Sequence, residues 1–241
     1  MSGKCCTTGN LHEGEPVGEI KEVFGLPTYV TGSSSSEKVI VILSDIFGLK
    51  IPNTKLVADQ FANSGYLVYV PDILFGDGLT NLDGSTDLGA FLEKHRPEVT
   101  RPIVDGFVLP LKETLNPKFL GVIGYCFGAK YALDYIKKDS PIADAAAIAH
   151  PSRLEIEQFW AIGQSPLLIS AAQYDRSFNF ETRHQVEKVL TEVRAIFKID
   201  LFSKVSHGFA IRGDLNDPFV KFSKEQVFSD QLNWFNHFSE A

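Results

Sequence analysis

The chain has 241 residues, 44% of them hydrophobic and 22% charged, and a formal net charge of −7. A hydrophobic content of this size excludes a disordered chain. An acidic balance without a cluster of Lys or Arg argues against nucleic acid as a partner. The first ten residues, MSGKCCTTGN, lack the apolar core of a signal peptide, and no apolar run is long enough to cross a bilayer. We therefore expect a cytoplasmic protein without a membrane partner, and these features also allow an additional nuclear location.

The cysteine content indicates a reducing compartment, because three cysteines, two of them adjacent at Cys5 and Cys6, form no disulfide framework. Neither Cys5 nor Cys6 has a paired His or Cys at the spacing of a zinc site, so we expect no metal. The P-loop and dinucleotide-binding patterns are also missing from the sequence. We therefore expect no cofactor.

The first half of the chain predicts a hairpin followed by alternating buried strands and helices. β-branched runs are typical of strands buried in a parallel sheet, and apolar residues at helical spacing predict the helices. In chain order the predicted elements are hairpin strands at 17–24 and 28–31, a strand at 38–44, a helix at 53–64, a strand at 66–70, a glycine-rich loop at 75–89, and helices at 88–95 and 99–115.

The second half continues the same alternation. Its predicted elements are a strand at 119–124, a helix directly after it, strands at 143–149 and 166–171, a helix at 181–193, a strand at 195–202 and a helix at 222–238. Strands that alternate with helices imply a mostly parallel sheet with helices on both faces, which is an α/β fold. No repeat or linker divides the chain, so we expect one domain over residues 1–241.

The segment FLGVIGYCFGAKYALDYI, residues 119–136, carries the most information about function. Gly124 and Gly128 flank Cys126 at two residues on either side, between a predicted strand and a predicted helix. This G-x-nucleophile-x-G pattern is the nucleophile elbow, whose tight turn leaves no room for side chains at the two glycines. A helix N-terminus also favours a thiolate. A buried core cysteine is the alternative interpretation, and the strand–turn–helix context favours a catalytic one.

Two further residues follow predicted strands and complete a catalytic set. Asp175 comes after the strand at 166–171, and His207 comes after the strand at 195–202. Parallel sheets bind ligands at the carboxyl ends of their strands. The order nucleophile, acid, histidine is that of α/β hydrolases. In this arrangement His207 transfers the proton and Asp175 orients the imidazole.

Each partner of Cys126 has a plainer alternative. Asp175 could be an ordinary turn residue and His207 a surface histidine. His150 is a rival base because it also ends a predicted strand, AAAIAH. It precedes Asp175 in the chain, which breaks the order, so we interpret His150 as a pocket-lining residue at best.

The segments GYCFG, AAQYD and SHGF, together with LSDIFGLKIPNT at 43–54, resemble the dienelactone hydrolase (carboxymethylenebutenolidase-like) family over nearly the whole chain. A cysteine in the elbow is the most specific feature of the resemblance. The resemblance implies an α/β-hydrolase fold, a triad of Cys126, Asp175 and His207, and hydrolysis of a small ester or lactone. It also implies an oxyanion hole formed by the backbone N–H groups of Ile46 and Phe127.

Asp45 and Arg212 are the candidates for substrate binding or gating. Bacterial members of the family carry glutamate in the segment that here reads SDIFG, and the resemblance places Asp45 beside the resting thiol. Family members also use arginines to hold the substrate carboxylate. Arg212 is the best local match, and Arg96 and Arg101 are weaker ones.

The sequence therefore predicts a hydrolase that forms a cysteinyl acyl-enzyme with a small-molecule ester or lactone. The rival hypothesis is a catalytically idle α/β-hydrolase fold that serves in protein interaction or ligand sensing. An intact triad in the right order argues against the rival. We expect a monomer or weak homodimer, and the physiological substrate stays open at this stage.

Overall fold

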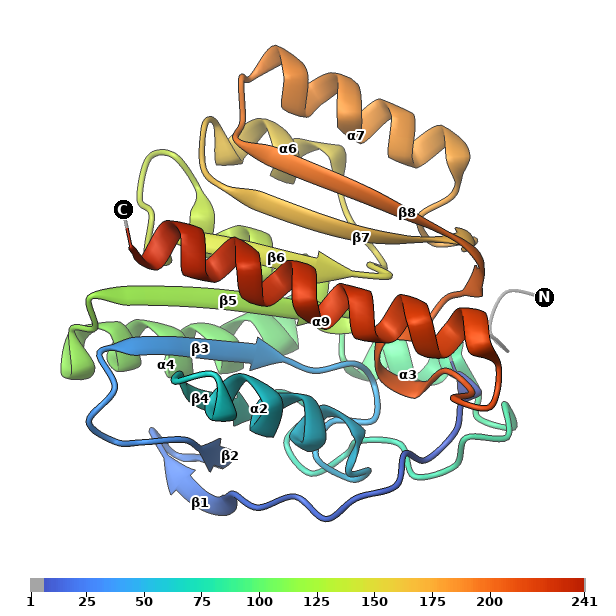
Figure 1. Ribbon diagram of the computed structural model, residues 1–241, viewed down its shortest axis with the longest axis horizontal. Coiled ribbons are helices and arrows are strands. Elements are labelled where there is room, and N and C mark those ends of the chain that lie inside the picture. The colour runs from blue at the N-terminus through green and yellow to red at the C-terminus, as the bar shows by residue number, and fades with distance from the viewer. Residues whose placement is uncertain (1–6, 241) are drawn as a thin grey trace.

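An eight-stranded sheet runs through the centre of the protein (Figure 1). The computed structural model describes residues 7–240. The strands are β1 (Glu19–Val23), β2 (Leu26–Thr31), β3 (Lys38–Leu43), β4 (Leu67–Pro71), β5 (Phe119–Tyr125), β6 (Ala145–Ala149), β7 (Leu167–Tyr174) and β8 (Phe197–Ser206). Their order in the sheet is β1-β2-β4-β3-β5-β6-β7-β8. The β1–β2 hairpin joins β4 antiparallel, and all further pairs, from β4–β3 to β7–β8, are parallel.

Helices cover both faces of the sheet, with α2 and α9 in front of it in Figure 1 and α4 behind it. The α-helices described are α2 (Asn53–Asn63), α3 (Leu88–Lys94), α4 (Pro97–Leu115), α5 (Ala129–Ala132), α6 (Ile156–Ile162), α7 (Phe180–Glu192), α8 (Phe209–Arg212) and α9 (Pro218–Ser239). Two short 3₁₀ helices, η1 (Cys126–Gly128) and η2 (Leu133–Ile136), flank α5.

The alternation of side chains along the strands divides the core into two layers. On β3, Val39 and Val41 point into the layer under α3, α4, α6 and α7, whereas Ile40 and Ile42 point into the layer under α2, α8 and α9. Successive residues of a strand face opposite sides of a sheet, so a strand buried on both faces needs a continuous apolar run. The run KVIVIL meets that need.

The predicted elements are confirmed, with differences at their ends and between them. β7 and β8 continue past their predicted ends to Tyr174 and Ser206. The helix expected after β5 is instead one α-helical turn between η1 and η2. The sequence did not reveal α6 or α8, because seven and four residues are too few for a helical period to stand out. The single-domain assignment over residues 1–241 stays a prediction.

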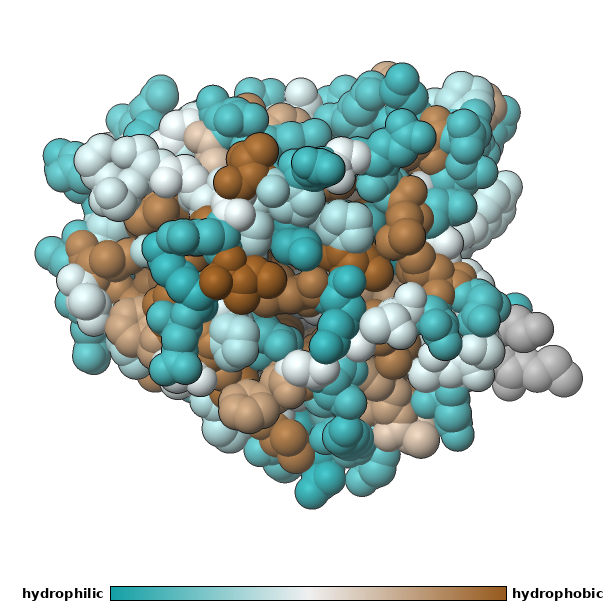
Figure 2. Space-filling model, turned by 90° about the horizontal axis from the view of Figure 1, so that it is seen from below, coloured by the Kyte–Doolittle hydropathy of each residue, from teal (hydrophilic) through white to brown (hydrophobic). Residues whose placement is uncertain are grey.

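Exposed apolar side chains lie among polar ones on the face seen from below (Figure 2). The β1–β2 hairpin lies at this side of the molecule in Figure 1, and Val17, Ile20 and Phe24 nearby are exposed. Within residues 7–240, no helix combines the length and the apolar character that crossing a bilayer requires.

Candidate active site

The turn after β5 places Cys126 at the carboxyl edge of the sheet. Cys126 has a φ of 50°, in the left-handed region that side chains other than glycine seldom adopt. A Cβ added at Gly124 would collide with Ala129, and one added at Gly128 would collide with the carbonyl of Leu43. Such strain persists only where the surrounding structure enforces it, and it concentrates at functional sites. A strained strand-to-helix turn with glycines at these two places has the geometry of a nucleophile elbow.

Asp175 directly follows β7, and His207 directly follows β8. His207 contacts Cys126 on one side of its ring and Asp175 on the other. The Nε2 atom of His207 lies 3.0 Å from the Sγ atom of Cys126. The Nδ1 atom of His207 lies 2.8 Å from Oδ2 of Asp175. The other carboxylate oxygen of Asp175 accepts hydrogen bonds from the backbone N–H groups of Ser177 and Phe178. All three side chains are buried, so the contacts form with little competition from water.

The surroundings of His207 favour its charged form. Burial by itself lowers the pKa of His207, but the neighbouring Cys126 and the hydrogen bond to Asp175 outweigh that effect and raise the pKa to about 10. The raised pKa favours the imidazolium form of His207, which can donate one N–H to Asp175 and the other to sulfur. An imidazolium at 3.0 Å stabilises a thiolate on Cys126.

Asp45 lies near this pair and is fully buried. Its Oδ2 atom accepts a hydrogen bond of 2.7 Å from Nη1 of Arg212, and its Oδ1 atom accepts one of 3.0 Å from the backbone N–H of Phe47. Burial raises the pKa of Asp45, the charge of Arg212 opposes the rise, and the sulfur of Cys126 adds to it. The influence of Cys126 on this pKa indicates that Asp45 lies within electrostatic reach of the sulfur.

Arg212 is buried and ion-paired with Asp45, so its position differs from that expected of a substrate-binding arginine. The other two arginines considered from the sequence also have carboxylate neighbours. Arg101 pairs with Asp134, and Arg96 lies near glutamates on the surface of α3 and α4.

His150 packs against His207. Its ring meets the His207 ring edge-on, with centroids 5.2 Å apart, and stacks on Tyr125 at 6.0 Å. Neither ring nitrogen of His150 has a hydrogen-bond partner among the described residues. Burial, followed by the charges of His207 and Arg212, lowers its pKa well below 6.5. A neutral, buried ring behind His207 does not hold the position of a base for Cys126.

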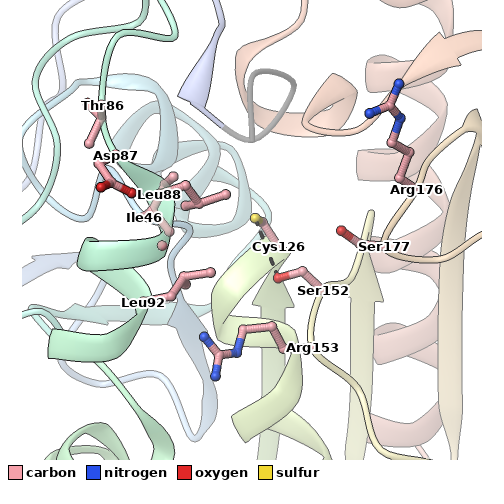
Figure 3. Close-up of a pocket in the computed structure, with 11 residues that line it drawn as sticks. Ile46, Thr86, Asp87, Leu88, Leu92, Cys126, Ser152, Arg153, Arg176 and Ser177 are labelled. Carbon is pink, nitrogen blue, oxygen red and sulfur yellow. Dashed lines mark hydrogen bonds between the residues drawn. The ribbon is translucent and has the colours of Figure 1, made fainter. Parts of the chain in front are cut away.

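A cavity of about 510 Å³ opens beside Cys126 (Figure 3). Ile46, Leu88 and Leu92 lie on one side of the sulfur in this view, and Ser152, Ser177 and Arg176 lie on the other. The full lining consists of Ile46, Thr86, Asp87, Leu88, Gly89, Leu92, Cys126, Ser152, Arg153, Arg176 and Ser177. The Oγ atom of Ser152 is 3.8 Å from the sulfur.

Sequence reasoning missed Arg153 and Arg176, the two cationic side chains of this lining. The signal was present, because Arg153 closely follows the end of β6 and Arg176 follows Asp175 at the end of β7. Residues after parallel strands gather at one edge of the sheet. The same rule predicted the position of Asp175, but it was applied only to possible catalytic residues. If it had also been applied to arginines, it would have predicted both Arg153 and Arg176.

The two residues expected to form the oxyanion hole are Phe127, next to Cys126 in the chain, and Ile46, in the same cavity lining. Phe127 follows Cys126 within η1 and is buried. Ile46 follows β3, the neighbour of β5 in the sheet, and lines the cavity. Among the described residues, no group of three or more His, Cys, Asp and Glu side chains is arranged to hold a metal ion.

A mostly parallel sheet with a strained strand-to-helix turn at its carboxyl edge defines the α/β-hydrolase class. Comparison with known families assigns the chain more narrowly. The model of the dienelactone hydrolase family matches residues 26–239, and the chain belongs to this family. It is accordingly a hydrolase of carboxylic esters or lactones.

Individual relatives agree with this assignment. The chain is 40% identical over 238 residues to a protein of Aspergillus violaceofuscus named hydrolase pyvD, with 98% of this chain and 96% of the relative covered. It is 36% identical over 242 residues to dienlactone hydrolase 1 of Gibberella moniliformis, and the match covers 95% of this chain and 91% of the relative. The fold is similar to the crystal structure of a dienelactone hydrolase from Klebsiella pneumoniae, with a TM-score of 0.70, 15% identity, and 88% and 92% of the two chains covered.

Proposed function

We propose that this protein hydrolyses a small ester or lactone through a covalent cysteinyl intermediate. Cys126 is the nucleophile, His207 the proton carrier and Asp175 the group that orients His207. The observation that supports these roles is the position of the His207 ring, 3.0 Å from the sulfur on one side and 2.8 Å from the carboxylate on the other. Nucleophile, base and orienting acid at hydrogen-bond distance are the arrangement that covalent catalysis requires.

The first half of the reaction forms the acyl-enzyme. The thiolate of Cys126 attacks the substrate carbonyl carbon, and the electron pair of the C=O bond moves to oxygen. The backbone N–H groups of Ile46 and Phe127 stabilise the resulting oxyanion. As the bond to the leaving oxygen breaks, the imidazolium of His207 gives that oxygen its proton. In a lactone the leaving alcohol or enol stays attached to the acyl chain.

The second half releases the acid. Neutral His207 now takes a proton from a water molecule, and the water oxygen attacks the thioester carbon. The C–S bond then breaks, which restores the thiolate of Cys126 beside the imidazolium of His207. One ester bond and one water molecule are consumed for each carboxylic acid and alcohol formed.

The cavity favours a small substrate with an apolar body and an anionic group. A volume of about 510 Å³ lies within the range of small-molecule sites. Ile46, Leu88 and Leu92 supply apolar surface, and Arg153 and Arg176 in the same lining supply positive charge near it. Arginine suits carboxylate recognition because its planar donors match two oxygens at once. We therefore assign the substrate carboxylate to Arg153 and Arg176 in place of Arg212.

The rival function, an idle fold that senses a ligand, predicts no covalent intermediate. The test is the mass of the protein after mixing with an activated ester, in a Cys5→Ser, Cys6→Ser background that leaves one thiol. One acyl group on Cys126, formed in a burst and lost on further incubation, is the expected result. A His207→Ala variant should acylate far more slowly. No acylation of Cys126 by any of a panel of cyclic and open-chain esters would favour the idle fold.

A further inference from the structure

The first described residues, Thr7 to His12, lie against the loop that leads to the cavity wall; we call them the N-terminal strap. The backbone N–H of Gly9 donates to the carbonyl of Leu82, and that of Gly84 donates to the carbonyl of Thr7. Thr8 and Asp83 form an antiparallel bridge between the two segments. The same loop continues to Thr86, Asp87 and Leu88, which line the cavity. The strap therefore fixes one end of the segment that forms this wall.

The strap also holds Arg212. The guanidinium Nε of Arg212 donates to the carbonyl of Thr8 at 3.0 Å, and its backbone carbonyl accepts the N–H of Asn10 at 2.9 Å. The stem of the Arg212 side chain lies so close to Gly9 that a Cβ added there would be 2.7–2.8 Å from three of its carbons. The arginine stem therefore occupies the space that any side chain at position 9 would need.

Asn53, at the start of α2, joins the strap to the segment that carries Arg212. Its Nδ2 atom donates to the carbonyls of Asn10 and Ile211, at 2.8 and 2.9 Å, and its Oδ1 accepts the N–H of His12. Asn53 is fully buried, and each of these backbone groups would be costly to leave unpaired. The strap is thus built into the fold along its length.

Through Arg212, the strap is connected to Asp45, the acid near Cys126. Arg212, held by the strap, donates to Asp45, and Asp45 adjoins Ile46, which lines the cavity and carries a proposed oxyanion donor. We infer that the N-terminal strap is a positioning element of the active site, which holds Arg212 against Asp45 and fixes the cavity wall at residues 82–88. The inference deepens the proposed function and rests on the assignment of Cys126 as its nucleophile.

The position of Arg212 determines how far the negative charge of Asp45 is compensated near the thiolate of Cys126. The charged or titratable groups around Cys126 are His207 with Asp175 behind it, Asp45 with Arg212 behind it, and the neutral His150. Asp87, Arg153 and Arg176 line the cavity beside the sulfur, and the strap contacts none of the three through the bonds described above. Arg212 neutralises Asp45 as long as the strap holds it. When the guanidinium is displaced, the carboxylate of Asp45 opposes the thiolate, and the thiol reacts more slowly below its pKa.

The test compares two substitutions that each add one methyl group. Gly9→Ala places that methyl against the Arg212 stem, whereas Gly106→Ala, in α4, places it in open space with nothing within 4 Å. In the Cys5→Ser, Cys6→Ser background, Gly9→Ala should slow alkylation of Cys126 by iodoacetamide about tenfold at neutral pH, which corresponds to a rise of one pKa unit. Gly106→Ala should leave the pH profile of alkylation unchanged.

A second variant and a double substitution separate positioning from general damage to the fold. Asn53→Ala removes the hydrogen bonds to the strap and the one to the carbonyl of Ile211, but leaves the Arg212 side chain itself unaltered, and it should shift the profile in the same direction. In an Arg212→Gln background, Gly9→Ala should cause no further shift, because the side chain through which the strap acts is gone. Hydrogen exchange should show faster opening at the amide of Gly84 in both strap variants.

Two results would overturn the inference. One is an alkylation profile that stays at its original position while hydrogen exchange shows the strap displaced. The other is an equal shift with and without Arg212, which would mean that Gly9→Ala acts through another route. Alkylation needs no substrate, so the outcome is independent of turnover. If Cys126→Ala retained hydrolysis, the proposed function would fail, and the strap would still be judged on its control of the thiol.

Discussion

Asp45 and Arg212, 167 residues apart in the chain, form an ion pair of 2.7 Å in which both side chains are buried. A buried pair of this kind is costly to break, because the remaining charge has neither water nor a partner. Because the pair lies near Cys126, a change to either member alters the electrostatic potential at the sulfur. The pair therefore links the resting state of the nucleophile to the fold around it.

Replacing Asp45 by asparagine should make Cys126 react faster with iodoacetamide in the absence of substrate. The substitution removes a negative charge near the thiolate and leaves the positive charge of Arg212, so the thiol pKa falls. We expect about a tenfold faster rate on the acidic side of the pH profile, the change that one pKa unit produces. Asp72→Asn is the matched control, because Asp72 also follows a strand but accepts the backbone N–H groups of Leu74 and Gly76. Coincident profiles for Asp45→Asn and the unaltered protein would limit Asp45 to shaping its loop.

Replacing Cys126 by alanine should abolish ester hydrolysis and leave the fold intact. The thiol is the covalent catalyst in the proposed mechanism, and alanine fills most of the same space. Cys126→Ser should retain less activity than the cysteine enzyme, because a hydroxyl needs stronger help from a base. Steady-state hydrolysis and circular dichroism of the purified variants provide the measurements. Turnover by a folded alanine variant would rule out the assigned nucleophile.

Replacing His207 by alanine should lower kcat by ~10²–10⁴-fold, the range for lost acid–base catalysis. His150→Phe should cost far less, since the His150 nitrogens have no hydrogen-bond partner in the described structure and a phenyl ring can keep the packing on Tyr125. His184→Ala, on the exposed surface of α7, is the control. Equal losses from the His207 and His150 variants would show that the two histidines share the task.

Replacing Arg153 or Arg176 by glutamine should raise KM for esters that carry a free carboxylate. Each variant loses one ion pair with the substrate carboxylate at a partly exposed site. The loss of such a pair corresponds to roughly a fivefold rise in KM. Esters in which the carboxylate is itself methylated should show no such rise, so the ratio of the two KM values is the measurement. Arg183→Gln, a partly exposed arginine of α7 that does not line the cavity, is the control. A rise for both kinds of ester would indicate damage to the cavity rather than loss of charge recognition.

The order and type of most elements could be predicted because their signals are local. The run KVIVIL has the apolar continuity of a strand buried on both faces, and β3 is such a strand. The break in the helix after the elbow had no such signal, since AKYALDYI has good helical spacing and tertiary packing interrupts it. Short α6 depends on a capping box between Glu155 and Gln158, too small a pattern to stand out beforehand.

By itself the sequence determined the class of fold, the elbow at Cys126 and the chain order of its partners, because parallel strands bring the residues that follow them to one edge. Only the tertiary structure decided that Arg212 faces Asp45 instead of the cavity, and that Arg153 and Arg176 line the cavity. The same holds for the strap, whose bond to Arg212 uses the backbone carbonyl of Thr8. Every residue has a backbone carbonyl, so the choice of this partner depends on packing between distant segments and leaves no trace in residue type.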